Sequence, residues 1–366
     1  FEQAMKSLHD GEISKPVQTQ FGVHLVQVLG RRTDTESPER LRNAARAKLR
    51  EAKGGEAYQQ WLRELRDRTY VEYRQKSDAA TTDPMANHRH DAGREKRPAG
   101  VIPRKRFGQH FLADRACIDA IVQAIAPRPD DNLVEIGPGT GVLTAPLVAQ
   151  TGHLTVIEID RDLGPRLAAQ YGDALTLVQQ DVLQVDFSGF GQNLRIVGNL
   201  PYNISSPLLL HLIAVADRVR DQHFMLQKEV VDRMVAGPGS DMGRLTVFLQ
   251  NHYQVAKLFD VPPEAFDPPP KVDSSVVRMV PLPRPHTTAI AQLEAALAAA
   301  YAQRRKMLRR TLGGWLAQQH PAFDLEKAAA SDARLVPLTD LSQRPEQIPV
   351  TAWYALADAL AARPLG

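Results

Sequence analysis

Short runs of apolar residues alternate with segments of helical periodicity from Val101 onward. The runs occupy residues 133–136, 154–159, 175–178, 194–197 and 223–226. Strands buried on both faces of a parallel sheet are nearly continuous in apolar residues, so these runs predict a doubly wound α/β sheet over residues 101–282. From about Thr287 the strand pattern stops and segments rich in Ala, Leu and Arg follow, which predicts a smaller helical domain over residues 283–366.

The residues before Val101 carry a different pattern. An apolar run at 21–29 predicts a strand, and residues 38–73 predict a charged amphipathic helix interrupted near Gly54. Residues 77–100 are polar and lack apolar periodicity, which predicts a linker after a separate piece formed by residues 1–76. Met85 in this linker is a candidate translation start, so our hypothesis is that the chain joins the tail of one reading frame to a second protein. Peptides spanning Tyr73 to Arg89 in mass spectra of the native protein would contradict a start at Met85.

Composition favours a globular protein of at least two domains. The 366 residues are 43% hydrophobic and 24% charged, and no apolar stretch is long enough to span a bilayer. We therefore expect no membrane segment, and residues 1–6 do not resemble a signal peptide. The single cysteine, Cys117, lies on the apolar face of an expected helix and is predicted to be a core thiol. The net charge of +3 is modest, so a nucleic-acid site must come from local clusters of basic residues.

A glycine-rich turn directly after the first apolar run indicates a nucleoside site. In the segment Glu-Ile-Gly-Pro-Gly-Thr-Gly, Gly137 and Gly139 let the backbone turn tightly and approach a ligand. Glu158, at the end of the next predicted strand, is placed to accept ribose hydroxyls, and Asp181, at the end of the third, to accept an adenine amino group. The alternatives are an ordinary turn for the glycines and a strand-end cap for Asp181.

Two acids and a glycine loop suit S-adenosylmethionine as well as a dinucleotide. The spacing here is Gly-x-Gly-x-Gly, whereas pyrophosphate binders favour Gly-x-Gly-x-x-Gly. A nicotinamide dehydrogenase is therefore the weaker interpretation.

The run Asn199-Leu200-Pro201-Tyr202 follows the fourth predicted strand and decides between these ligands. The exocyclic amine of adenine is a poor nucleophile because its lone pair is delocalised into the ring. The Asn199 side-chain oxygen and a neighbouring backbone carbonyl could hold both N–H groups of such an amine. Tyr202 offers a face on which a base can stack, worth ~1–3 kcal/mol per base. Pro201 fixes φ and lacks an N–H, which suits a rigid turn, although a plain strand exit is the alternative interpretation.

Basic residues gather in two places outside this turn. Arg104, Lys105 and Arg106 are interleaved with aromatic residues, which is typical of an RNA-facing arm; a solvated basic turn is the alternative. Residues 304–310 hold five bases in one predicted helical stretch, and Arg304 and Arg305 begin it. Phosphate contact there would make binding sensitive to salt, whereas the alternative is a solvated helix face.

A proline-rich loop over residues 262–273 contains Phe266 and Lys271. The loop is too polar and irregular to predict as core. Phe266 could stack on the second face of an extruded base or anchor the loop. Lys271 is a further candidate for contact with RNA.

Six motifs in this order resemble the ribosomal RNA adenine dimethyltransferases, and within them the bacterial enzymes that act on small-subunit RNA. The resemblance covers residues from about 104 to 360 and rests on residues 104–112, 135–139, 156–160, 198–205, 224–230 and 268–274. It implies a Rossmann-like class I methyltransferase fold with a C-terminal helical RNA-binding domain. It also implies transfer of two methyl groups from S-adenosylmethionine to N6 of each of two adjacent adenines near the 3′ end of 16S rRNA.

The same resemblance implies roles for individual residues. The residues that would line the donor site are His110, Leu112, Gly137, Gly139, Glu158, Asp181 and Asn199. Asn199 and the Leu200 carbonyl would hold the target amine, with Tyr202 and Phe266 stacking on its base. His110 stands where many relatives carry Asn, and either side chain can hydrogen-bond. No metal is implied, and we expect a cytoplasmic monomer whose partner is 16S rRNA in the immature small subunit.

Residues 1–76 resemble the C-terminal end of the parvulin-type prolyl isomerases of the periplasm, through residues 1–4, 11–17 and 21–25 and the helix that follows. Only the second half of a parvulin domain has a counterpart, so we expect no isomerase activity. Three other functions stay open: an erythromycin-resistance methyltransferase acting on large-subunit RNA, an RNA-binding assembly factor with vestigial catalysis, and an isomerase with an attached domain. The intact run 199–202 favours active chemistry, and the proline-rich loop and C-terminal helices favour small-subunit RNA.

Overall fold

The computed structural model describes residues 8–9, 11–19, 22–29, 109–202, 204–239, 241–303 and 305–362. The chain divides into two compact units, Phe1–Ala80 and Thr81–Gly366. Within the described ranges, no helix is long and apolar enough to cross a membrane.

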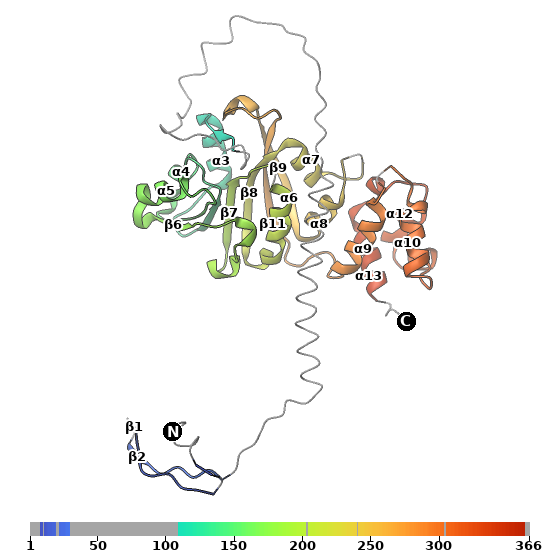
Figure 1. The fold of residues 1–366 in the computed structure, drawn as a ribbon. Coiled ribbons are helices and arrows are strands. Elements are labelled where there is room, and N and C mark those ends of the chain that lie inside the picture. The colour runs from blue at the N-terminus through green and yellow to red at the C-terminus, as the bar shows by residue number, and fades with distance from the viewer. Residues whose placement is uncertain are drawn as a thin grey trace, which may run out of the picture. The chain divides into compact units, whose positions relative to one another are not determined.

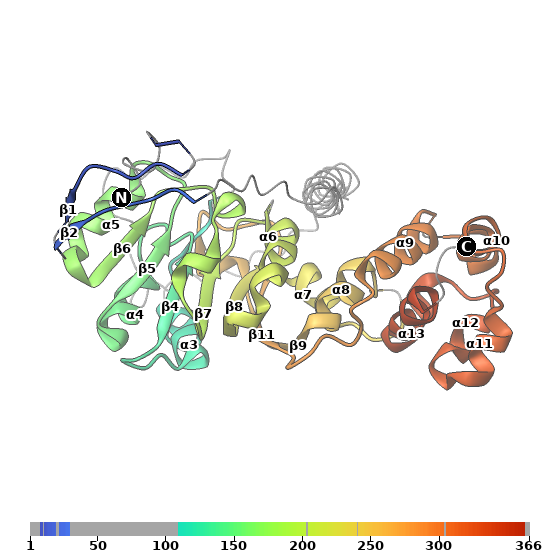
Figure 2. The same cartoon turned by 90° about the horizontal axis from the view of Figure 1, so that it is seen from below.

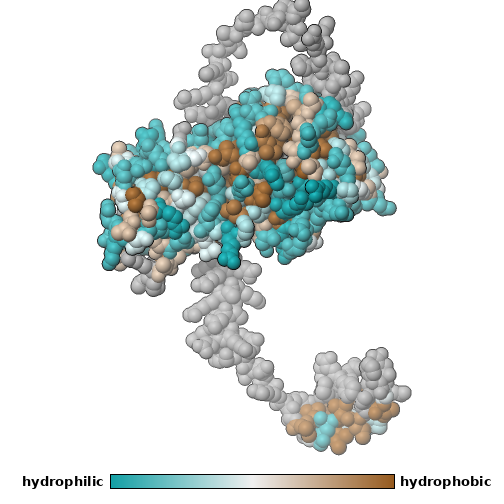
Figure 3. All heavy atoms as spheres, turned by 180° about the vertical axis from the view of Figure 1, so that it is seen from behind, coloured by the Kyte–Doolittle hydropathy of each residue, from teal (hydrophilic) through white to brown (hydrophobic). Residues whose placement is uncertain are grey.

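The first unit contains a small antiparallel hairpin. Strands β1 (Val17–Thr19) and β2 (Gly22–His24) pair, and Ile13 forms a bridge with Gln27. The strand predicted over 21–29 is thus confirmed only in part, while the helix and linker predicted for 38–73 and 77–100 lie outside the described residues. Apolar side chains of the hairpin are exposed, as the brown spheres of this unit in Figure 3 show. They are Ile13, Val23, Leu25 and Leu29, each more than half accessible.

A seven-stranded mixed sheet forms the centre of the second unit, in the order β6-β5-β4-β7-β8-β11-β9 (Figure 1). Its strands are β4 (Asn132–Ile136), β5 (Leu154–Ile157), β6 (Leu175–Val178), β7 (Leu194–Asn199), β8 (Val219–Gln227), β9 (Tyr253–Val261) and β11 (Ser274–Pro281). Strands β4 to β8 are parallel, and β11 runs antiparallel to both β8 and β9. All five predicted strands are confirmed, whereas β9 and β11 were not predicted.

Helices cover both faces of this sheet, so the doubly wound prediction is confirmed. The helices of the second unit up to β9 are α3 (Arg115–Ile125), α4 (Thr144–Thr151), α5 (Leu163–Tyr171), α6 (Ser205–His211), α7 (Lys228–Val235) and α8 (Arg244–His252). Successive residues of a strand point to opposite faces. Leu133 accordingly packs in one apolar core with α3, α4 and α5, and Val134 packs in the other with α6, α7 and α8.

Short elements complete the second unit. Strand β3 (Phe111–Leu112) pairs antiparallel with β10 (Phe266–Asp267) outside the main sheet. The 3-10 helices are η3 (Gly172–Ala174), η4 (Val182–Gln184), η5 (Phe187–Phe190), η6 (Leu212–Arg218), η7 (Pro263–Ala265), η8 (Leu308–Arg310), η9 (Ala333–Leu335) and η10 (Pro345–Gln347).

The C-terminal segment is helical, as predicted, and lies at the β9 end of the sheet, away from β6 (Figure 2). Its helices are α9 (Ile290–Tyr301), α10 (Leu312–Gln319), α11 (Leu325–Ser331), α12 (Val336–Thr339) and α13 (Val350–Ala361). The Tyr354 hydroxyl of α13 donates to the Val247 carbonyl of α8 at 2.9 Å. The Asn251 side chain of α8 donates to the Thr287 carbonyl at 3.1 Å and accepts from its amide at 2.9 Å. These buried bonds join the C-terminal segment to α8.

The helical stretch predicted over residues 304–310 is wrong. Helix α9 ends at Tyr301, and 3-10 helix η8 begins only at Leu308. The amides of Leu308 and Arg309 donate to the carbonyls of Gln343 and Leu341, at 2.8 and 2.9 Å, instead of to the preceding turn. Residues 305–307 therefore lie in a loop that leads into η8, and buried Leu308 anchors it.

Candidate active site

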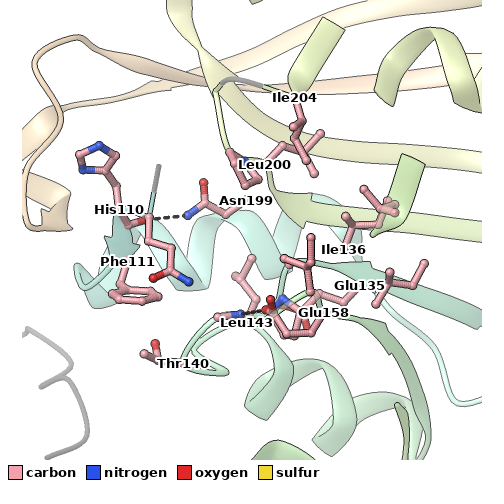
Figure 4. Close-up of a pocket in the computed structure, with 18 of the residues that line it drawn as sticks. His110, Phe111, Glu135, Ile136, Thr140, Leu143, Glu158, Asn199, Leu200 and Ile204 are labelled. Atoms are coloured by element: carbon pink, nitrogen blue, oxygen red, sulfur yellow. Dashed lines mark hydrogen bonds between the residues drawn. The ribbon is translucent and has the colours of Figure 1, made fainter. Parts of the chain in front are cut away.

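A cavity of about 220 Å³ opens at the carboxyl ends of β4, β5, β6 and β7 (Figure 4). This volume is far larger than one water molecule, which takes up roughly 30 Å³ in the liquid. It lies where open α/β sheets bind ligands. The lining residues are 109–112, 135–140, 142–143, 157–159, 180–182, 199–202 and 204. All the predicted donor-site residues are among them.

The glycine loop brings main chain against the cavity. Gly137 and Gly139 have φ of +65° and +58°, a region that side-chain-bearing residues rarely adopt. A Cβ on Gly139 would lie 3.1 Å from the Phe111 ring. The turn therefore needs glycine both for its conformation and for the approach of β3.

Glu158 is a buried carboxylate at the end of β5, with 5% of its surface accessible. It accepts the amide of Gly139 at 3.2 Å and the amide of Asp160 at 2.8 Å. Burial raises the pKa of Glu158 from its usual range, and the two amides act in the opposite direction. A carboxylate has about four lone-pair sites, so acceptor capacity is left for ligand hydroxyls.

Asp181 both lines the cavity and caps a turn. Its Oδ1 accepts the Leu183 amide at 3.0 Å and so begins η4. Asp181 can therefore cap the turn after β6 and still face a ligand in the cavity. Ile159, which is 45% exposed, adds apolar surface to the same cavity.

Glu135 is a cavity residue to which the sequence assigned no role. Only 1% of its surface is accessible, and the Thr144 hydroxyl donates to its Oε2 at 2.7 Å. Burial raises the pKa of Glu135 to about 7, and the negative charge of Glu158 adds to the effect. In the sequence, the feature that could have indicated this residue is an acid near the end of an otherwise apolar strand, just before the glycine loop.

Asn199 is oriented by the main chain of residue 110. Its Nδ2 donates to the His110 carbonyl at 3.1 Å, as the dashed line in Figure 4 marks. Because a carbonyl can only accept, this bond decides which end of the amide is nitrogen. No described residue donates to the Asn199 Oδ1 or to the Leu200 carbonyl. The turn thus presents two oxygen acceptors beside the cavity.

Close packing holds this turn against the sheet. A Cβ on Gly198 would lie 2.5 Å from the carbonyl oxygen of Ile136. The Leu200 amide donates to the Met225 carbonyl at 3.1 Å, and the Pro201 carbonyl accepts the Ile204 amide at 3.1 Å. Gly198 is therefore a positioning residue without an earlier assignment.

The Tyr202 ring lies between the turn and β11. Its hydroxyl shares a hydrogen bond of 2.8 Å with Ser274 Oγ, and burial raises the pKa of the Tyr202 phenol. The imidazole of His110 stacks against the ring, with centroids 5.8 Å apart and planes at 24°. The His110 Nδ1 donates to the Pro268 carbonyl at 2.9 Å.

The expectation that the proline-rich loop lies outside the core is wrong for Phe266, because only 1% of its surface is accessible, which favours the alternative of a loop anchor. Phe266 pairs with Leu112 across β10 and β3, and its side chain packs in the core with Met225 and Val276. The segment that looks irregular in sequence is half of a small strand pair, whose inward position needs an apolar residue. Phe266 thus supports β3 instead of lining the cavity.

The predicted RNA-contacting cations have different outcomes. Arg104, Lys105, Arg106 and Arg304 lie outside the described residues. Lys271 and Arg305 are exposed. Throughout the described ranges, no cluster of His, Cys, Asp and Glu could hold a metal ion.

The cavity fits a nucleoside that carries a methyl-donating group. Main chain approaches through the glycines, the Glu158 carboxylate has acceptor capacity for ligand hydroxyls, and Ile159 and Asp181 line the same cavity. The Asn199 and Leu200 oxygens stand at the far end of the same cavity, next to an aromatic ring.

Comparisons with known proteins agree with this geometry. The profile of the family described as "Ribosomal RNA adenine dimethylase" matches residues 102–335. "Ribosomal RNA small subunit methyltransferase A" of Bordetella avium is 57% identical over 263 residues, which cover 71% of this chain and 95% of the relative. The protein of the same name in Leptothrix cholodnii is 54% identical over 261 residues, covering 69% and 96%.

Two solved structures share the fold. A dimethyladenosine transferase from Plasmodium falciparum has a TM-score of 0.56 at 25% identity, covering 68% of this chain and 96% of its own. The 23S rRNA methyltransferase ErmE has a TM-score of 0.54 at 24% identity, covering 69% of this chain and 99% of its own. At this identity the likeness shows a shared fold alone. From the profile match and the close relatives, the chain belongs to the ribosomal RNA adenine dimethylase family of S-adenosylmethionine-dependent methyltransferases.

Proposed function

We propose that the protein transfers methyl groups from S-adenosylmethionine to N6 of two adjacent adenines near the 3′ end of 16S rRNA, in the immature small subunit. The relatives named small-subunit methyltransferases support this substrate, because they match this chain over almost their whole length. The observation that carries the proposal is the pair of oxygens at Asn199 and Leu200, beside Tyr202 and in the same cavity as Glu158.

Residues at the donor end would hold the cofactor. The proposed donor-site residues are His110, Leu112, Gly137, Gly139, Glu158, Asp181 and Asn199. S-adenosylmethionine supplies an electrophilic methyl group on a sulfonium when it is bound. The glycine turn lets main chain come close, and Glu158 accepts hydroxyls while its buried position strengthens these bonds.

Residues at the other end would hold the target amine. The Asn199 Oδ1 and the Leu200 carbonyl would each accept one N–H, which favours a more tetrahedral nitrogen and stabilises the positive charge that develops on it. These oxygens need no reorganisation, because the bond to His110 and the packing of Gly198 already hold them. Tyr202 would stack on the base, and Pro201 would keep the turn rigid. The proton acidified during transfer can leave to solvent, so the site needs no strong general base.

A cationic surface on the C-terminal helical domain, residues 283–366, would bind RNA backbone. Exposed cations on the loop between α9 and α10 are Arg305, Lys306, Arg309 and Arg310. None of the described acids forms a salt bridge with them. Unpaired surface cations suit phosphate contacts, which make affinity fall with salt. Lys271 and the arm Arg104–Arg106 are proposed as further contacts.

A radiolabelled methyl-transfer assay tests the proposal. The substrates are free 16S rRNA, small subunits that lack the modification, and large subunits. We expect transfer to the undermodified small subunits, and Asn199→Ala should abolish it while leaving donor binding partly intact. Transfer to large subunits alone would favour the activity named for ErmE. RNA binding without transfer would favour an assembly factor. Near-normal turnover of Asn199→Ala would contradict the role of Asn199.

Three further assignments belong to this proposal. We place the protein in the cytoplasm, where ribosomal subunits assemble, and we propose that it acts as a monomer, which light scattering at working concentration tests. We propose that residues 1–76 form a truncated parvulin-like fragment without isomerase activity, joined by the linker 77–100. A proline-peptide isomerisation assay checks that fragment, and measurable catalysis would contradict its assignment.

A further inference from the structure

The turn that carries Glu158 is bridged by one side chain from the neighbouring strand. Gln179 directly follows β6, and its Nε2 donates to the carbonyls of Glu158 and Asp160 at 2.7 and 3.2 Å. The pairing of β5 with β6 ends just before this point, at Ile157 and Val178. Gln179 therefore continues the connection between the two strands beyond their last paired residues.

The bridged turn orients the Glu158 carboxylate. The Asp160 amide donates to Glu158 Oε1 at 2.8 Å, and this amide belongs to the peptide unit that joins residues 159 and 160. The peptide units on either side of it carry the two carbonyls that accept from Gln179. Because both flanking units are held, the amide between them keeps its direction, and the carboxylate that it binds keeps its orientation.

Gln179 does not need these two bonds to satisfy a buried group. Its side chain is exposed, so water could take the place of the carbonyls at little cost to its amide. Its Oε1 lies at the first turn of α5, where a Cβ placed on Gly164 would be 2.7 Å away. The two ends of the Gln179 amide thus meet two different elements, and the nitrogen end meets the turn of Glu158.

We propose that Gln179 is a positioning residue of the donor site, which holds Glu158 in the orientation that accepts the ribose hydroxyls of S-adenosylmethionine. This inference rests on the proposed function, because it concerns the residue that would hold the ribose. The residues that line the cavity do not include Gln179, so it acts through Glu158. An acceptor that is already oriented binds more tightly than one that must be ordered when the ligand arrives.

Two substitutions separate hydrogen bonding from packing. Gln179→Met keeps most of the length of the side chain but removes the donor, whereas Gln179→Lys keeps a donor long enough to reach the carbonyls. We expect Gln179→Met to weaken binding of S-adenosylhomocysteine by about 2- to 12-fold in calorimetry, the range of one net hydrogen bond. Gln179→Lys should restore most of this loss. With undermodified small subunits, the KM for the donor should rise in Gln179→Met while kcat stays unchanged.

A ligand without ribose hydroxyls shows whether the loss passes through Glu158. The 2′,3′-dideoxy analogue of S-adenosylhomocysteine offers this carboxylate no hydroxyl, so its Kd should be the same in the wild type and in Gln179→Met. The wild type should prefer the hydroxylated ligand by roughly 10- to 150-fold, the range of a hydrogen bond to a charged group. In Gln179→Met this preference should fall by the same factor by which the Kd for S-adenosylhomocysteine rises.

A matched control is Gln318→Met, at an exposed glutamine of α10. It should leave the Kd of both ligands unchanged, and the thermal midpoint of every variant reports folding.

Three results would overturn the inference. An unchanged Kd for S-adenosylhomocysteine in Gln179→Met would show that the bridge does not position Glu158. Equal weakening of both ligands would reveal a general disturbance of the donor site, which is what a purely structural role produces. A Gln179→Lys variant that binds no better than Gln179→Met would assign the effect to packing against α5. A wild type that binds both ligands equally would instead overturn the proposed role of Glu158 together with the inference, which distinguishes the two failures.

Discussion

Replacing Glu135 by glutamine tests how burial controls the charge of the cavity. The carboxyl pKa is raised from 4.5 to about 7, chiefly by burial. Each pKa unit corresponds to about 1.4 kcal/mol, so the ionised form costs about 3 kcal/mol in the folded protein. Glutamine has nearly the same shape, and its carbonyl oxygen can still accept the Thr144 hydroxyl that lies 2.7 Å from Glu135 Oε2.

The sign of the pH dependence follows from linkage. A carboxyl whose folded pKa lies above its unfolded pKa binds its proton more tightly in the folded state. Its contribution to stability is complete below pH 4.5 and is lost as the pH rises through about 7. We therefore expect Glu135→Gln to stabilise the unliganded protein by about 3 kcal/mol at pH 8 and by less than about 1 kcal/mol at pH 5.

Thermal unfolding followed by circular dichroism measures this difference. For a domain of this size, 1 kcal/mol shifts the thermal midpoint by about 2–4 °C, so the expected gain at pH 8 is about 6–12 °C. Glu264→Gln, at an exposed carboxyl, is the matched control and should show no gain at either pH. An equal gain at pH 5 and pH 8, or no gain at pH 8, would refute the electrostatic reasoning.

Three other substitutions test packing, a second buried group and the RNA surface. Gly198→Ala places a Cβ 2.5 Å from the Ile136 carbonyl oxygen, and such overpacking costs about 1–3 kcal/mol, so both the thermal midpoint and kcat should fall. Burial lowers the pKa of His223 to about 4, so the contribution of this ring to stability is lost as the pH falls from 6.5 to 4. The free energy of unfolding of His223→Leu should therefore fall less over this pH range than that of the wild type, by up to about 3 kcal/mol. Arg309→Gln with Arg310→Gln should weaken RNA binding and lower the slope of log affinity against log salt by about 2, one per phosphate contact.

Matched controls make these outcomes specific. Gly189→Ala adds a Cβ with no atom within 4 Å, so a loss as large as that of Gly198→Ala would contradict the close approach. An unchanged acid profile for His223→Leu would contradict the effect of burial on that ring. Arg334→Gln removes a cation already paired with Asp332 at 2.7 Å, and a salt slope equal to that of the double variant would argue against the basic loop.

The sequence predicted the parallel strands well and the antiparallel pair poorly. Strands β4 to β8 are covered by helices on both faces, so each contains a short run rich in apolar residues that can be recognised locally, although β8 also buries Asp221, Gln222 and His223. Strand β9 lies at the edge of the sheet and places exposed residues at alternate positions along its length. Strand β11 follows a proline-rich segment that hides its start. Both strands depend on pairing between residues that are distant in the chain, and local periodicity carries no information about such pairing.

The candidate site likewise has features that the sequence predicted and features that it did not. Its residue types could be predicted, because a glycine turn, acids at strand ends and an Asn–Tyr turn each have chemistry that is visible from spacing alone. The positions of Phe266 and His110 could not, because they depend on the pairing of β10 with β3. The pKa of Glu135 likewise depends on the surroundings that remove it from water.

By itself, then, the sequence predicted five buried strands with a glycine turn, two acids and an Asn–Tyr turn at their carboxyl ends. It also determined the family, since those motifs occur together and in order. Only the tertiary structure decided that the Phe266 ring is buried in the core, which carboxyl is hard to ionise, and where the basic loop is anchored. These properties arise from contacts between segments up to about 160 residues apart, such as His110 with Pro268. Burial and distance of that kind exist only once the chain has folded.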